Sequence, residues 1–112
     1  MKLAVIFLNR IEYLEDLLSA FLEIGISGST IIDSVGMGHI ISQNIPIFAG
    51  LKDTFAGSSP IQKTILTLVE DDMISRIDEV LAEICISIDE SRAYFMVSLA
   101  IDGVYGFNSA ET

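Results

Sequence analysis

The chain has 112 residues and a mass of 12.2 kDa, with 6 basic and 16 acidic side chains that give a net charge of −10. This length fits one domain with a single core, and 51% apolar residues with a mean hydropathy of +0.57 exclude a disordered chain. The acidic balance argues against nucleic-acid binding, because phosphate contacts need clustered Lys and Arg. The single cysteine excludes an intramolecular disulfide and a cysteine-based zinc site.

The first half of the chain predicts a strand, a helix and a second strand. Residues 2–8 form a short apolar run, and Asn9-Arg10-Ile11-Glu12 matches a capping box at a helix start. The helix has an apolar stripe at helical spacing, formed by Leu14, Leu17, Leu18, Phe21 and Leu22. Gly25 is placed to end this helix, and residues 29–35 are rich in β-branched side chains, which favour a strand.

The second half repeats this plan. Residues 63–69 predict a strand, Glu70-Asp71-Asp72 opens a helix, and residues 94–101 predict the last strand. The helix has its own apolar stripe, formed by Ile74, Ile77, Leu81 and Ile84. The order βαββαβ favours the α+β class with a ferredoxin-like fold, a four-stranded antiparallel sheet with two helices on one face. We expect residues 1–112 to form this single domain, with a long excursion at about residues 37–61.

The predicted sheet has apolar side chains on both faces. Right-handed crossovers place both helices on the same side of such a sheet, so the other face of a monomer should be polar. In the first strand, however, Leu3, Val5 and Phe7 are as apolar as the alternate residues Ala4, Ile6 and Leu8. We therefore predict a homo-oligomer whose sheets face inward. The alternative is a monomer in which the excursion folds over the sheet.

The excursion does not have the composition of a flexible spacer. It mixes apolar side chains with Pro, Gly and Ser residues, and long loops in compact domains tend to be functional. One interpretation is a segment that docks a protein partner, with Pro46, Phe48 and Phe55 in contact with it. The other is that these side chains pack on the same subunit or on a neighbouring one.

Three segments of the chain resemble the PII nitrogen-regulatory signal transducers and their PII-like relatives. They are residues 24–30, Val35-Gly36-Met37-Gly38 and residues 69–74, and the similarity covers nearly the whole chain. The resemblance implies a homotrimer that binds an adenine nucleotide in clefts between subunits, often with magnesium and 2-oxoglutarate. It also implies signalling through residues 37–61 to an enzyme, a regulator or a transporter. Carried over by position, the resemblance implies that Thr30, Gly36, Met37 and Gly38 line the cleft.

The chain departs from this family where phosphates are bound. The family has a glycine-rich, basic loop before the last strand, and this chain has Ile88-Asp89-Glu90-Ser91-Arg92. The arginines of the family's last strand correspond to Asp102 and Val104, and Asp repels a triphosphate. Arg92 is the one basic residue left near this region, and we include it among the ligand-binding candidates. We predict that ATP binding is weak or absent, which leaves the ligand unidentified.

The remaining chemistry-bearing residues favour structural roles. His39 is interpreted as a solvated loop histidine, Cys85 as a buried and inert thiol, and Glu70-Asp71-Asp72 as helix-capping groups rather than a magnesium site. With no nucleophile motif, phosphate loop or metal-ligand cluster, we expect neither an enzyme nor a metal site. The alternatives to a PII-like regulator are a structural oligomeric scaffold without a ligand and a metal-tolerance trimer of the CutA type. No targeting or membrane segment is recognised, so we expect a cytoplasmic protein that does not insert into membranes.

Overall fold

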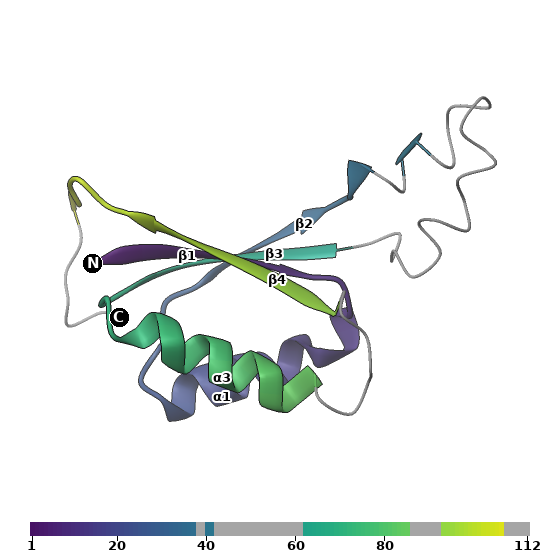
Figure 1. Ribbon diagram of the computed structural model, residues 1–112, viewed down its shortest axis with the longest axis horizontal. Helices are drawn as coiled ribbons and strands as arrows, with labels where there is room; N and C mark the ends of the chain where they lie inside the picture. The colour runs from purple at the N-terminus through teal and green to yellow at the C-terminus, as the bar shows by residue number, and fades with distance from the viewer. Residues whose placement is uncertain (38–39, 42–61, 86–92, 107–112) are drawn as a thin grey trace.

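A computed structural model describes residues 1–37, 40–41, 62–85 and 93–106. The described elements form two layers, a twisted sheet and a pair of helices that lie on one side of it (Figure 1). In chain order they are β1 (Lys2–Leu8), η1 (Ile11–Tyr13), α1 (Leu14–Glu23), β2 (Thr30–Ser34), β3 (Gln62–Val69), α3 (Met73–Cys85) and β4 (Tyr94–Ala100).

The sheet has the order β2-β3-β1-β4, and all of its neighbouring strands are antiparallel. With the element order βαββαβ, this topology confirms the predicted α+β, ferredoxin-like fold. Each predicted strand is present, and its observed ends lie within one residue of the predicted ones. The predicted excursion at residues 37–61 lies between β2 and β3 in chain order, and apart from 37 and 40–41 it is outside the described residues.

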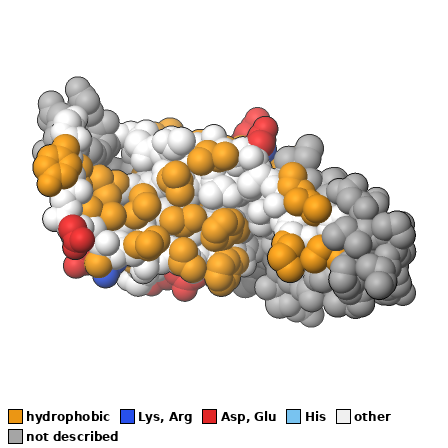
Figure 2. Space-filling model, turned by 90° about the horizontal axis from the view of Figure 1, so that it is seen from above, with side chains coloured by type: hydrophobic (Ala, Val, Ile, Leu, Met, Phe, Trp, Pro, Cys, Tyr) orange, Lys and Arg blue, Asp and Glu red, His pale blue; other side chains and the backbone are white. Residues whose placement is uncertain are grey.

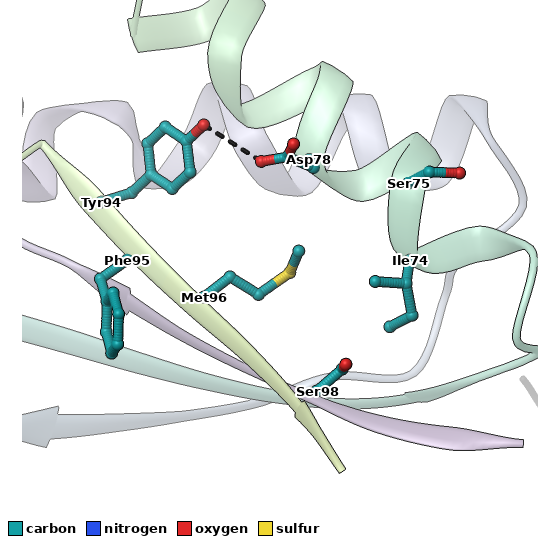
Figure 3. Close-up of a pocket in the computed structure, with 7 residues that line it drawn as sticks. All are labelled: Ile74, Ser75, Asp78, Tyr94, Phe95, Met96 and Ser98. Atoms are coloured by element: carbon teal, nitrogen blue, oxygen red, sulfur yellow. Dashed lines mark hydrogen bonds between the residues drawn. The ribbon is translucent and has the colours of Figure 1, made fainter. Parts of the chain in front are cut away.

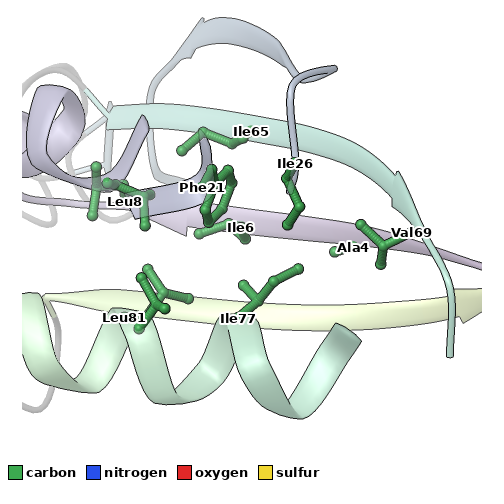
Figure 4. Close-up of a cluster of buried hydrophobic side chains, with 11 residues drawn as sticks. Ala4, Ile6, Leu8, Phe21, Ile26, Ile65, Val69, Ile77 and Leu81 are labelled. Carbon is green, nitrogen blue, oxygen red and sulfur yellow. The ribbon is translucent and has the colours of Figure 1, made fainter. Parts of the chain in front are cut away.

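The core lies between the helices and one face of the sheet. In the central strands, Ile6 and Ile65 are register partners, and both are fully buried. Phe21 of α1 and Ile77 and Leu81 of α3 reach this face from the helices (Figure 4). The whole buried cluster is Ala4, Ile6, Leu8, Leu17, Phe21, Ile26, Ile65, Val69, Ile77, Val80 and Leu81.

The end of α1 is fixed by a glycine. Gly25 has a φ of +94°, a conformation that residues with a Cβ atom rarely adopt. The N–H of Ile26 donates to the carbonyl of Phe21 at 2.8 Å, and that of Gly25 donates to the carbonyl of Leu22 at 3.2 Å. These are the two bonds of a Schellman motif, and its hydrophobic contact joins Phe21 and Ile26 in the core. The prediction for Gly25 is confirmed.

Two predictions about the first helix are wrong. Asn9 caps neither helical segment: the N-cap of η1 is Arg10 and that of α1 is Tyr13, and neither makes a capping hydrogen bond through its side chain. The Asn9 side chain serves the sheet, because its Oδ1 accepts from Gln62 Nε2 at 2.7 Å. Leu22, predicted in the apolar stripe, is 66% exposed, since the sheet covers a narrower face of α1 centred on Leu17 and Phe21.

Candidate functional site

The sheet face opposite the helices is a broad apolar surface. Alternation along the strands and the pairing register place one set of side chains on this face. We call it the open face, and its large apolar members are Leu3, Val5, Phe7, Ile32, Leu66, Leu68, Phe95, Val97 and Leu99. Figure 2 shows these apolar groups across the middle of the sheet, with acidic groups at the margin of the view.

The open face is exposed most strongly along its β4 side. Phe95 is 59% exposed and Leu99 is 48% exposed, although both are large apolar side chains. Phe95 stacks on Phe7 of the neighbouring strand, with ring centroids 5.7 Å apart and an angle of 25° between the ring planes. No helix among the described residues covers this face. A patch of this kind marks an interaction surface, because exposed apolar area of this extent is unfavourable in water.

Polar contacts join β2 and β3 where the excursion leaves the sheet. On the open face, Ser34 Oγ donates to the Gln62 carbonyl at 3.1 Å and lies 2.7 Å from Thr64 Oγ1. The Gln62 amide extends this network to Asn9 at the end of β1. On the helix side, Lys63 Nζ pairs with the carboxylate of its register partner Asp33. Side-chain contacts on both faces of the sheet therefore join the end of β2 to the start of β3.

The structure does not bring the described candidate ligand residues together. Thr30 is exposed at the start of β2, next to its register partner Leu66. Gly36 and the 74% exposed Met37 follow the other end of this strand. The six residue-to-residue steps from Thr30 to Gly36 correspond to about 20 Å of extended chain, so a ligand in contact with both would have to run along β2.

Gly36 is not required by the packing of the described chain. A Cβ atom added there meets no described atom within 4 Å, and its φ lies outside the left-handed region. The other candidate residues lie outside the described residues: Gly38, His39, Pro46, Phe48, Phe55 and Arg92.

The acidic segment at the start of α3 makes structural contacts. The carbonyl of Glu70 accepts from the Met73 N–H at 3.0 Å, and Asp71 Oδ1 lies 2.9 Å from the amino group of Met1. The hydrogen bond and charge of this ammonium lower the pKa of the Asp71 carboxyl. Within the described ranges, no three His, Cys, Asp or Glu side chains gather closely enough to hold a metal ion.

Cys85 lies in the last turn of α3 and is 6% exposed. Burial raises the pKa of its thiol, because the thiolate loses the solvation that stabilises its charge. A neutral buried thiol is a poor nucleophile. The prediction of a buried thiol is confirmed.

A groove of about 650 Å³ runs between α3 and the edge strand β4 (Figure 3). Ser75 and Asp78 come from the helix, and Tyr94, Met96 and Ser98 come from the strand. The Tyr94 hydroxyl donates to Asp78 Oδ1 at 3.2 Å and so ties the two elements together. Ile74 and Phe95 complete the lining. The groove thus combines apolar walls with hydroxyl and carboxylate groups.

The groove has an acidic character. Asp78 is exposed, and no Lys or Arg is among the lining residues. Burial raises the pKa of the Tyr94 hydroxyl, and the nearby Asp78 carboxylate adds to this shift, so the tyrosine stays protonated and donates. Sequence reasoning missed this groove, because Asp78 and Tyr94 are neighbours only through the packing of α3 on β4.

Within the described part of the chain, neither helix has the length and apolar character needed to cross a membrane. Searches of the chain against models of known protein families and against curated protein sequences find no match.

Proposed function

We propose that this protein is a PII-like regulatory module: a cytoplasmic homotrimer that binds a small ligand between subunits and acts on a protein partner through residues 37–61. The ferredoxin-like topology supports this proposal, as does the position of the excursion between β2 and β3. The observation that carries it is the open face. Thr30 lies beside this face, at the first residue of β2.

The argument for self-association is energetic. Burying a large apolar side chain contributes about 1.5–3 kcal/mol, and the open face presents such side chains on every strand of the sheet. Copies of the chain supply a matching apolar surface, so an assembly with its sheets inward covers all of them at once. The number of copies, three, comes from the resemblance to the PII transducers.

Light scattering coupled to size-exclusion chromatography tests the assembly. At micromolar concentration we expect a particle three times the 12.2 kDa of one chain. Val97→Asp places a charge on the open face at an edge-strand position that is 37% exposed, and we expect it to give monomers with unchanged circular dichroism. Glu79→Gln, on the exposed side of α3, is the matched control and should stay trimeric. A monomeric wild-type chain would reject the proposal.

A thermal-shift screen tests the ligand. Binding to the native state raises the melting temperature, by an amount that corresponds to about 2.7 kcal/mol at a hundredfold excess over Kd. The screen should contain nucleotides, 2-oxoacids, bicarbonate and divalent metals, and we expect a response to one class with little or none to ATP. Sub-micromolar ATP binding by calorimetry would contradict the prediction of weak binding. A flat screen of a trimeric protein would favour the scaffold without a ligand.

A further inference from the structure

The residues of the edge strand β4 offer none of the sequence features that usually protect a strand against pairing with another. Its sequence, Tyr94 to Ala100, contains no charged residue, proline or glycine, and it pairs with β1 in unbroken register. The other edge strand, β2, is shorter and carries Asp33 in an ion pair. Proteins protect exposed edges with charges, prolines, bulges or short strands, because unpaired backbone groups recruit further strands. On the outer side of β4, no described strand is present.

The register defines which backbone groups of β4 are available. The N–H of Asn9 donates to the carbonyl of Ala93 at 2.9 Å, so these two residues form a hydrogen-bonded pair. Hydrogen-bonded and non-hydrogen-bonded pairs alternate along an antiparallel ladder. The N–H and C=O groups of Tyr94, Met96 and Ser98 therefore point away from β1, toward the open side of the sheet.

The same three residues project their side chains into the groove beside α3. A strand added along β4 would hydrogen-bond to Tyr94, Met96 and Ser98, and every second side chain of it would enter this groove. The intervening side chains would extend the open face beside Phe95, Val97 and Leu99. In the groove such a strand meets the Asp78 carboxylate. On the same helix Glu83 is exposed, and the exposed Glu79 is paired with Arg76 at 3.4 Å.

We propose that β4 and the groove together bind an extended segment of a partner protein, which adds as a strand and places a Lys or Arg side chain opposite Asp78. Along the segment, side chains that enter the groove alternate with apolar side chains that lie on the side of the open face. The charge of the groove selects this occupant, since its lining contains a carboxylate and no cation. The lining of this docking site comes from α3 and β4, and the site does not depend on the ligand of the proposed function.

The probe is the peptide Val-Thr-Val-Lys-Val-Thr-Val-amide with fluorescein on its N-terminal amino group, and a second peptide labelled in the same way has Glu in place of Lys. Fluorescence anisotropy with the wild-type chain should show about threefold tighter binding of the Lys peptide, the effect of one exposed ion pair. Asp78→Asn should abolish this preference, whereas the control Glu79→Gln should keep it. Amide shifts in NMR spectra should concentrate on Tyr94, Met96 and Ser98.

Ser98→Pro tests the main-chain pairing. Proline removes an outward N–H without breaking the ladder to β1, so we expect both peptides to bind about tenfold more weakly, as for the loss of one to two hydrogen bonds. Ser98→Ala keeps the N–H and is the comparison, so it should bind both peptides more tightly than Ser98→Pro does. The proposal is overturned if the peptides do not bind at millimolar concentration, if Lys and Glu peptides bind equally, or if the NMR shifts concentrate on Val5 and Leu66.

Particle mass separates this proposal from the proposed function. Asp78→Asn and Ser98→Pro should leave the mass unchanged by light scattering, while Val97→Asp should reduce it. If Ser98→Pro instead dissociates the particle, a second copy of the chain occupies the β4 edge, and the docking proposal is wrong while self-association is retained. If the wild-type chain is monomeric and still prefers the Lys peptide, the docking proposal stands and the trimer does not.

Discussion

The two faces of the sheet have similar amino acids and very different surroundings. On the helix side, Ile6 and Ile65 are completely buried. On the open face, Phe95 and Leu99 are 59% and 48% exposed, although they belong to a strand paired with β1 in the same sheet. The comparison shows that side-chain hydrophobicity alone does not decide burial within one chain.

The difference comes from the connections between the strands. Both crossovers of the βαββαβ order carry their helix to the same side, so α1 and α3 cover one face of the sheet, and among the described elements none covers the other (Figure 1). A face that is apolar without cover is unfavourable for an isolated subunit. The following predictions test how differently the two faces respond to change.

The largest effect is expected on the covered face. Ile6→Ala removes a fully buried side chain from the central strand and leaves a cavity between the sheet and both helices. We expect a loss of about 3 kcal/mol in the free energy of unfolding, measured by urea denaturation. The loss should be the same at low and high protein concentration. A loss below about 1 kcal/mol would show that the covered face is not tightly packed.

Phe95→Ala tests the open face. It removes a stacked partner of Phe7, a contact worth about 0.5–1.5 kcal/mol beyond the buried area. If copies of the chain cover this face, the melting temperature of the wild type should rise with protein concentration and that of the variant should rise less. The melting temperature of Ile6→Ala, measured over the same protein concentrations, is the control, because that variant leaves the open face unchanged. A wild-type melting temperature independent of concentration would mean that the face stays uncovered.

Thr67 is the buried polar residue of the covered face among those described, with 2% exposure. Its hydroxyl donates to the carbonyl of Gly28 at 2.8 Å and so connects β3 to the segment before β2. Thr67→Val keeps the shape and removes this bond, so we expect a loss of about 1 kcal/mol in calorimetric stability. Thr64→Val, on the open face, removes instead the partly buried contact with Ser34 and is the comparison. If the free energy of unfolding of Thr67→Val is unchanged, this hydrogen bond makes no net contribution to stability.

The base of the excursion offers a smaller contrast between the faces. Ser34→Ala removes the hydroxyl that joins Gln62 and Thr64 on the open face, and we expect it to cost about 1 kcal/mol. Asp33→Asn removes an ion pair on the helix side whose carboxylate side chain is 75% exposed, and about 0.5 kcal/mol is expected. Only the second loss should shrink at high salt. If both losses depended equally on salt, the contact between Asp33 and Lys63 would not act as an ion pair.

The smallest effect concerns Cys85 and pH. Burial raises the pKa of its thiol in the folded state. The contribution of the neutral thiol to the free energy of unfolding is therefore fully present below the ordinary thiol pKa, and it is lost as the pH rises through the folded-state pKa. Iodoacetamide at pH 8 should therefore label the folded protein slowly and the urea-unfolded protein rapidly. Rapid labelling of the folded chain would show that the last turn of α3 opens readily.

Local signals predicted most of the fold. Short apolar runs and β-branched residues located the strands, and the stripe through Leu17 and Phe21 located the first helix. Gly25 was predicted to end that helix because no neighbour is needed for a glycine to adopt a positive φ. The N-cap prediction failed for the converse reason, since a distant partner, Gln62, engages Asn9.

The candidate site was less predictable. The open face followed from counting apolar residues on both parities, together with the handedness of the crossovers. The groove did not follow, because it needs Asp78 on α3 and Tyr94 on β4 to meet, and no pattern in the chain encodes that approach. The described ligand candidates were chosen by resemblance, and the structure places Thr30 and Gly36 at opposite ends of β2.

The amino-acid sequence by itself determined the elements, their order and the apolar character of both sides of the sheet, because these depend on periodicity and on residues close along the chain. The tertiary structure decided which parity the helices cover, which strands form the edges and which side chains meet across the groove. These features arise from packing and strand register between segments far apart in the chain, where a shift of one residue would exchange the two faces.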